Sequence, residues 1–113
     1  MGTLAELKNK LRSPENKVVL QAVEELRARG WLSDGSLHGI ALCKVNLEGA
    51  DLMGADLSNV DFHQAHLDFA DLSMTNLRAA KLSRAYLIGA NFSMADLSRA
   101  DLYKANFRGA RNL

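Results

Sequence analysis

The sequence predicts a solenoid, a chain wound into stacked coils, preceded by a short helical segment. Two patterns support this fold class. A large apolar residue recurs at every fifth position through most of the chain, whereas the first 30 residues show the apolar spacing of amphipathic helices. The change of pattern divides the 113 residues into a helical segment, residues 1–35, and a repeat region, residues 36–113.

The apolar period of five runs without a slip from Leu37 to Phe107. It fits neither the period of 3.6 in a helix nor the period of 2 in a flat strand. Each unit can bury its apolar face only against its neighbours, and a stack of coils achieves this. We therefore expect the core to consist of fifteen central residues: Leu37, Leu42, Leu47, Leu52, Leu57, Phe62, Leu67, Leu72, Leu77, Leu82, Leu87, Phe92, Leu97, Leu102 and Phe107.

Two further positions of each unit are restricted. The residue two places before the central one is apolar and mostly alanine, with Thr75 as the polar exception. The residue directly before the central one is Asp or Asn in ten of the fifteen units. Alanine suits a crowded inner corner, and Asp and Asn side chains hydrogen-bond backbone groups at tight turns. Each unit is therefore expected to form one short side and one corner of a coil.

The segments at 50–52, 55–57 and 90–92 read Ala-Asp-Leu, Ala-Asp-Leu and Ala-Asn-Phe, and they resemble the pentapeptide repeat family with its pattern A-(D/N)-L-x-x. The resemblance covers residues 36–110, or 75 of the 113 residues, without a gap. It implies an all-β solenoid, a right-handed quadrilateral β-helix with four pentapeptides per coil. Fifteen units then make about four coils, and the solenoid is about 18 Å tall at the usual strand spacing.

The first 30 residues carry the signals of two helices. Thr3 and Glu6 match a capping box at the start of the first helix. Ser13 and Pro14 match the N-cap and the first position of the second helix, which Gly30 ends. The apolar residues at helical spacing are Leu4, Leu7 and Leu11 in the first helix and Val19, Ala22, Val23 and Leu26 in the second.

These helices are expected to cover the open N-terminal end of the solenoid. A terminal coil exposes unpaired backbone groups and an apolar axis, and both need a cover. Trp31 and Leu32 follow the second helix and are expected to plug this end, with Trp31 against Leu37 and Leu42. In the alternative interpretation, the two helices form a hairpin that recruits a partner protein.

The C-terminal end shows no such cover, because Asn112 stands where the pattern requires Leu and no helical pattern follows. An uncovered edge favours pairing with another edge, and a two-fold axis closes such a contact. We therefore expect a homodimer through Leu97, Leu102, Phe107 and Leu113. Two alternatives stay open. The last three residues could fold over the edge as a minimal cap, or the sequence could be cut from a longer chain.

An apolar strip is expected on the outside of the solenoid. Its five members occupy positions that should point outward, and they are Met53, Phe69, Met74, Ile88 and Met94. Exposed apolar residues grouped together mark contact surfaces, so this strip is the candidate site for an unidentified protein partner. Alternatively, the N-terminal helices fold back along the strip, or its side chains only cover the corner.

The charge of the chain restricts its partners. The 14 basic and 13 acidic residues give a net charge of +1, which disfavours direct binding to nucleic acids. One stacked column, Lys44, Gln64, Arg84 and Lys104, is basic and is expected to be a solvated face paired with neighbouring acids. The single cysteine, Cys43, excludes an internal disulfide. No membrane-spanning run or signal peptide is apparent, so a cytoplasmic location is expected.

No catalytic, metal or cofactor site is expected. Cys43 and His63 stand twenty residues apart and should stack, and His66 follows three residues later. Three soft ligands fall short of the four that zinc prefers. A convex solenoid face also lacks the cleft that a nucleophilic Cys-His pair needs.

The sequence therefore favours a non-enzymatic structural or protein-interaction module, a rigid scaffold that self-associates through its C-terminal coil. The family resemblance implies an alternative, because some pentapeptide repeat proteins resemble duplex DNA and regulate DNA gyrase. That activity is expected to need a long acidic rod, and the near-neutral charge disfavours it.

Overall fold

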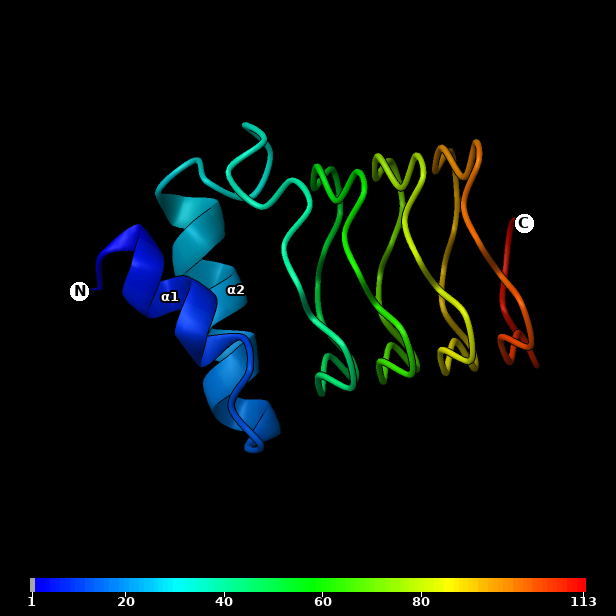
Figure 1. The fold of residues 1–113 in the computed structure, drawn as a ribbon, viewed down its shortest axis with the longest axis horizontal. Helices are drawn as coiled ribbons and strands as arrows, with labels where there is room; N and C mark the ends of the chain where they lie inside the picture. Colours follow the sequence, from blue (N-terminus) through cyan, green and yellow to red (C-terminus); the bar gives the residue numbers. More distant parts are fainter. Residues whose placement is uncertain (1) are drawn as a thin grey trace.

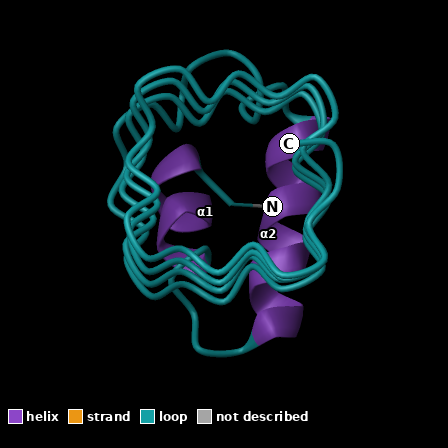
Figure 2. Ribbon diagram, turned by 90° about the vertical axis from the view of Figure 1, so that its right-hand side faces the viewer, coloured by secondary structure: helices purple, strands orange, loops and turns teal. Residues whose placement is uncertain are grey.

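The computed structural model describes residues 2–113 as two helices followed by a solenoid (Figure 1). Helix α1 spans Leu4–Lys10 and helix α2 spans Asn16–Ala28. Viewed along the solenoid axis, the coils superpose into a four-sided outline (Figure 2). The side view shows both helices at one end of the stack (Figure 1). The helices therefore occupy one end of the stack and leave the sides of the solenoid open.

Helix α1 begins at the predicted cap. The Thr3 hydroxyl oxygen accepts a hydrogen bond from the backbone N–H of Glu6 at 3.1 Å. The Glu6 carboxylate accepts a hydrogen bond from the Thr3 hydroxyl at 3.3 Å instead of binding the Thr3 backbone N–H. Only one half of a capping box is therefore formed.

Helix α2 begins later than the sequence predicts, and the assignment of Ser13 and Pro14 to its first positions is wrong. The N-cap position belongs to Glu15, whose carbonyl accepts the N–H of Val19 at 3.1 Å. The Ser13 hydroxyl accepts the backbone N–H of Glu15 at 3.1 Å. Ser13 therefore closes a tight turn before the helix, which uses the same side-chain chemistry as a cap.

Helix α2 ends at Ala28, and the predicted stop residue Gly30 follows its C-cap Arg29 with a φ of 77°, in the left-handed region. The Gly30 N–H donates to the Arg27 carbonyl at 3.0 Å, and the Trp31 N–H donates to the Leu26 carbonyl at 2.9 Å. This pair of bonds is a Schellman motif. It turns the chain from the helix toward the solenoid.

Residues twenty apart stack in the repeat region. Eleven parallel bridges connect such pairs, from Ala41 with Asp61 to Asn91 with Arg111. Four pentapeptides therefore complete one coil. Each bridge is isolated, and no extended strand occurs within residues 2–113. A corner at every fifth residue leaves room for only one bridging residue per side, so the β-helix is built from bridges where the all-β expectation implied strands.

Every corner uses a left-handed residue. In the unit centred on Leu47, the Ala50 N–H donates to the Leu47 carbonyl at 3.0 Å, and Gly49 between them has φ 71°. This geometry is typical of a type II turn. The equivalent position is left-handed in all fifteen units, and ten of them carry a side chain there: Lys44, Asn59, Gln64, Phe69, Met74, Ala79, Arg84, Met94, Arg99 and Lys104.

The predicted turn role of Asp and Asn is confirmed in all ten units that contain them. In each unit the side-chain oxygen accepts the backbone N–H two residues later, as Asp61 does from His63 at 3.0 Å. The unit with Tyr86 in this position lacks such an acceptor. There, the Asp68 carboxylate from the preceding coil accepts the N–H of Ile88 at 2.9 Å.

The interior of the solenoid and the inner faces of the helices form one apolar core. The central residues from Leu37 to Phe92 are buried, whereas Leu97, Leu102 and Phe107 in the last coil are partly buried. The buried Thr75 satisfies its hydroxyl by donating to the Leu72 carbonyl at 2.6 Å. The apolar period therefore corresponds to an inward-facing column along the whole stack.

The two helices are hydrogen-bonded to the first coil. Arg12 donates to the carbonyl of Ala41 at 2.9 Å, and Asn16 donates to the carbonyl of Glu48 at 3.1 Å. Leu32 is buried, as a plug would be, but Trp31 is only partly buried, with the Arg29 guanidinium 4.3 Å from its ring centroid. Trp31 packs against the core with its ring partly exposed, and the Arg29 guanidinium lies over that ring.

Candidate interaction surfaces

One side of the solenoid, formed by residues 40–44, 60–64, 80–84 and 100–104, carries the column that begins at Cys43; we call it the Cys43 side. His63 Nδ1 lies 2.7 Å from the Ser83 hydroxyl in the next coil. On a neighbouring side, His38 and Ser58 repeat this contact at 2.7 Å. The repetition indicates that the His–Ser pairs connect successive coils, since neither lies in a cleft.

Asp61 controls the chemistry of Cys43. Burial raises the pKa of the Cys43 thiol, and the hydrogen bond and negative charge of Asp61 raise this pKa further. Burial also acts to raise the pKa of Asp61, but the His63 N–H and the Cys43 thiol outweigh it and hold this pKa below the usual carboxyl value. At neutral pH the thiol is therefore protonated beside an ionised carboxylate. Such a thiol is a weak nucleophile.

The variant Asp61→Asn is expected to make Cys43 more reactive. Removing the negative charge lowers the thiol pKa, while the Asn amide oxygen still accepts the His63 N–H. Alkylation by iodoacetamide at pH 8 should be faster than in wild type, because a larger fraction of the thiol is ionised. Asp101→Asn, in the same column two coils away, is the matched control and should leave the rate unchanged. Equal rates for wild type and Asp61→Asn would contradict the predicted coupling.

The basic column on this side is not paired with acids, contrary to the sequence-based expectation. Within residues 2–113 the ion pairs are Arg27 with Asp51, Arg29 with Glu25, and Arg78 with Asp96. Arg84 and Lys104 instead lie 5.9 and 5.3 Å from the ring centroid of Tyr103. Tyr103 and Lys104 belong to the last coil and Arg84 to the coil before it, so the aromatic ring lies near both cations in place of the expected carboxylates.

The predicted apolar strip lies on the adjoining flank, which is formed by residues 45–54, 65–74, 85–94 and 105–113 and is here called the Phe69 flank. Phe69, Met74 and Met94 are 62%, 60% and 82% exposed. All three occupy left-handed corner positions. Met53 is less exposed, and Ile88 is partly buried.

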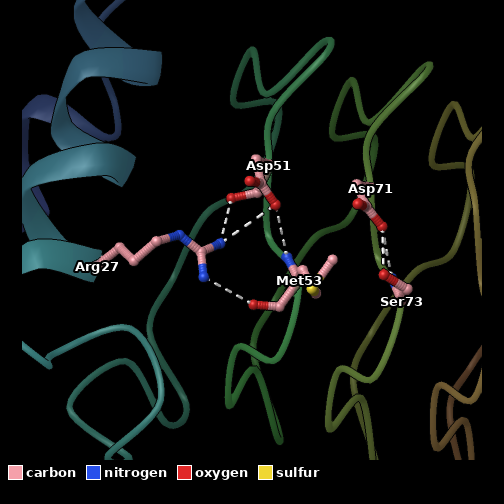
Figure 3. A network of polar contacts seen from close by, with 5 residues as sticks. All are labelled: Arg27, Asp51, Met53, Asp71 and Ser73. Atoms are coloured by element: carbon pink, nitrogen blue, oxygen red, sulfur yellow. Dashed lines mark hydrogen bonds and ion pairs between the residues drawn. The ribbon is translucent and has the colours of Figure 1, made fainter.

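The N-terminal helices do not fold back along this strip, and that alternative is wrong. Arg27 of α2 donates to the carbonyls of Asp51 and Met53 at 2.8 and 3.1 Å (Figure 3). This contact reaches only the first coil. In the next coil, Asp71 binds the backbone N–H and hydroxyl of its own neighbour Ser73. The centre of the Phe69 flank is therefore accessible.

Phe69 lies over a glycine of the next coil. A Cβ atom built on Gly89 would come within 2.6 Å of the Phe69 ring. Gly89 itself has φ 67°, whereas the equivalent Gly49 has φ 71° and no neighbour within 4 Å of a Cβ atom. The absence of a side chain at position 89 thus makes room for the aromatic ring. The proposal that such residues only cover the corner holds in part for Phe69.

Gly89→Ala is expected to cost more than Gly49→Ala. Both substitutions place alanine in the left-handed region, at about 1 kcal/mol each. Gly89→Ala also displaces the Phe69 ring, which adds about 1 kcal/mol of lost packing. In a Phe69→Ala background the difference between the two variants should vanish. Urea unfolding followed by circular dichroism measures all four free energies, and a persistent difference would contradict the predicted contact.

The last coil presents the residues of the expected homodimer interface. Leu97, Leu102 and Phe107 are partly buried, and Leu113 is 69% exposed. The N–H of Leu77 donates to the Asp96 carbonyl of the following coil at 2.8 Å. The equivalent N–H groups of the last coil, on Leu97, Leu102 and Phe107, have no backbone acceptor among the described residues.

Charge is segregated along the solenoid axis. Residues 36–77 contain one basic and six acidic residues, a net charge of −5. Residues 78–113 contain seven basic and two acidic residues, a net charge of +5. Because these halves cancel, the near-zero total of the repeat region conceals an acidic half next to the helices and a basic half at the other end.

The described residues offer little for small-molecule chemistry. Residues 2–113 enclose no detectable pocket, and they bring together no group of three or more His, Cys, Asp or Glu residues placed to hold a metal ion. Neither α1 nor α2 is long and apolar enough to cross a membrane. The functional features that remain are surfaces.

Comparison with known proteins places the chain in a class. The sequence profile of pentapeptide repeats matches eight copies over residues 31–59, 46–84 and 80–111. The chain belongs to the pentapeptide repeat family. The family membership that the A-(D/N)-L-x-x pattern predicts is thereby confirmed.

Solved structures of the same family resemble this chain. HetL, involved in heterocyst differentiation regulation in the cyanobacterium Nostoc, is 39% identical with a TM-score of 0.68, over 75% of this chain and 35% of HetL. Another Nostoc pentapeptide repeat protein is 30% identical with a TM-score of 0.64, over 83% of this chain and 87% of its own. One from the thylakoid lumen of Arabidopsis thaliana is 30% identical with a TM-score of 0.60, over 62% of this chain and 49% of its own.

The chain therefore spans about half of the Arabidopsis protein and about a third of HetL. None of the curated protein sequences compared with the chain matches it.

Proposed function

We propose that this chain is a non-enzymatic interaction module, a rigid solenoid that works by presenting its outer surfaces to other protein surfaces. The observation that supports this function best is the exposure of Phe69, Met74 and Met94 on a surface held by hydrogen bonds between coils. Exposed apolar groups of this kind mark contact sites. Pentapeptide repeat proteins serve in general as such modules.

Residues 1–35 serve in this proposal as a cap for the repeat region, residues 36–113. The support is the set of bonds from Arg12, Asn16 and Arg27 to carbonyls of the first coils. These bonds satisfy backbone acceptors that would otherwise face solvent at the end of the stack. The helices therefore make the N-terminal end unavailable for pairing with another solenoid.

The second element of the proposal is self-association through the C-terminal coil. Its support is the partial exposure of Leu97, Leu102 and Phe107, together with their N–H groups that lack backbone acceptors. A two-fold contact between two such coils would bury both features. A DNA-mimic activity is not proposed, since it would need a continuous acidic surface and residues 78–113 are basic.

Light scattering coupled to size exclusion tests this contact with Phe107→Asp. Wild type should elute as a dimer, and Phe107→Asp as a monomer with an unchanged circular dichroism spectrum. Tyr103→Asp, which adds the same charge to an exposed side chain of the same coil, is the matched control and should remain dimeric. A folded Phe107→Asp variant with the mass of the wild type would overturn the C-terminal contact.

A further inference from the structure

The columns of the Phe69 flank have a pattern that only the stacking of coils makes visible. Two columns change from acidic to basic along the axis, and they read Glu48, Asp68, Ile88, Arg108 and Asp51, Asp71, Asn91, Arg111. Two columns are apolar at symmetrical positions, and they read Met53, Ser73, Ser93, Leu113 and Gly54, Met74, Met94. Reversing the order of the coils therefore exchanges acid for base in the end coils and keeps apolar opposite apolar. In the middle coils it places Asp68 opposite Ile88 and Asp71 opposite Asn91.

A two-fold axis that lies in the contact plane, perpendicular to the direction of the solenoid axis, performs this reversal. It places each column opposite the same column of the second copy, with the first coil opposite the last and the second opposite the third. Glu48 then faces Arg108 of the other copy, and Met74 faces Met94. Every such pair occurs twice, because the contact is isologous.

We propose that the Phe69 flank binds a second copy of this chain in antiparallel orientation. The proposal rests on the proposed function only in that both involve self-association. It uses the outer side of all four coils, whereas the C-terminal contact uses the open end of the last coil. Charge complementarity between Glu48 and Arg108 favours a second copy as the partner and an antiparallel orientation for it. A parallel arrangement would place the acidic half of one copy against the acidic half of the other, where like charges repel.

The neighbouring Cys43 side does not share this property. Reversal there would place Lys44 opposite Lys104, and both are basic. On the Phe69 flank, by contrast, Glu48, Asp68 and Asp71 form no ion pair among residues 2–113. Arg108 and Arg111 are likewise without an ion-pair partner there. Glu48 and Arg108, which would meet across the contact, are therefore both available, whereas Arg111 would share Asp51 with Arg27.

The size of the flank predicts a weak dimer. The molecule measures 36 × 25 × 19 Å, so one flank offers at most about the 800 Å² per partner of a standard stable interface. Exposed charge pairs are also screened by salt. We therefore expect an association that is favoured by high protein concentration and weakened by added NaCl.

Sedimentation equilibrium from micromolar to about 1 mM protein tests the proposal with a charge exchange. Arg108→Glu and Glu48→Lys should each weaken dimerisation about tenfold, because each puts like charges opposite each other twice. The double variant, with both substitutions in one chain, should recover most of the affinity. Arg99→Glu, which makes the same charge change in the last coil on another side, is the matched control and should associate like the wild type. Met74→Ser with Met94→Ser should fold normally and dimerise more weakly.

The same experiment separates this contact from the C-terminal one. Only the antiparallel flank contact brings Glu48 and Arg108 together, so recovery in the double variant supports it. Loss of the dimer in Phe107→Asp, with Arg108→Glu and Glu48→Lys unaffected, would overturn the flank contact and leave the proposed function standing. A wild type that is monomeric at every concentration would overturn both contacts.

Discussion

Leu72→Asp is expected to prevent folding at 25 °C. Leu72 is fully buried in the column of central residues, between Leu52 and Phe92 of the adjacent coils. A carboxylate at this position would have no hydrogen-bond partner and no counter-charge, and burying it costs several kcal/mol. The lost apolar contacts and the cavity add about 3 kcal/mol. Together these costs match the total stability of a typical small domain, about 5–15 kcal/mol.

Circular dichroism with a thermal melt measures the outcome for Leu72→Asp. Met74→Asp, two residues further along the same unit, is the matched control, because the Met74 side chain is exposed. The control should melt within a few degrees of wild type, as surface substitutions usually do. If both variants melt alike, the assignment of Leu72 to the inside of the solenoid is wrong.

Ala70→Leu is expected to produce the second largest loss, about 3 kcal/mol of unfolding free energy. Ala70 occupies an inner corner between Ala50 and Ala90, and all three are buried. Coils stack at about 4.8 Å, so a leucine at this corner must push into the alanine above or below it. The hydrogen bonds on both sides, from Asp71 N–H to the Ala50 carbonyl and from Asn91 N–H to the Ala70 carbonyl, resist separation of the coils.

Urea titration gives the free energy for Ala70→Leu. Ala41→Leu is the matched control, because it adds the same atoms at an exposed site. We expect the control to stay within about 0.5 kcal/mol of wild type. A midpoint for Ala70→Leu equal to that of the control would show that the corner has room, contrary to the packing described above.

The features that the sequence predicts correctly have local causes. The central apolar residue must be buried in every unit, so its period of five is explicit in the residue types. The Asp or Asn before it binds a backbone N–H only two residues away, so one unit contains both partners. The left-handed corners could not be predicted in this way. Residues as different as Lys44, Phe69 and Ala79 occupy them, because the geometry comes from the packing of the whole coil and not from the residue itself.

The individual hydrogen bonds between coils also could not be predicted from the sequence. The hydrogen bond from Ile88 N–H to Asp68 joins residues in equivalent positions of adjacent coils, and it occurs where Tyr86 provides no acceptor within the unit. The start of the second helix was misjudged at Ser13, because a short side chain can close a turn as well as cap a helix. For the candidate surfaces, residue types identified the apolar strip, but the total charge concealed the two oppositely charged halves.

The stacking of residues twenty apart fixes how the solenoid surface changes when units are added or lost. Inserting one pentapeptide between residues 77 and 78 would leave every inward residue inward, and it would rotate everything after it by a quarter of a coil. Arg108 would then move to a different side from Glu48, although the fold and the composition would hardly change. Inserting four units would restore the alignment on a taller stack. Inserting a whole coil therefore lengthens each face and keeps its pattern of residues. Inserting part of a coil rearranges that surface pattern and keeps the fold.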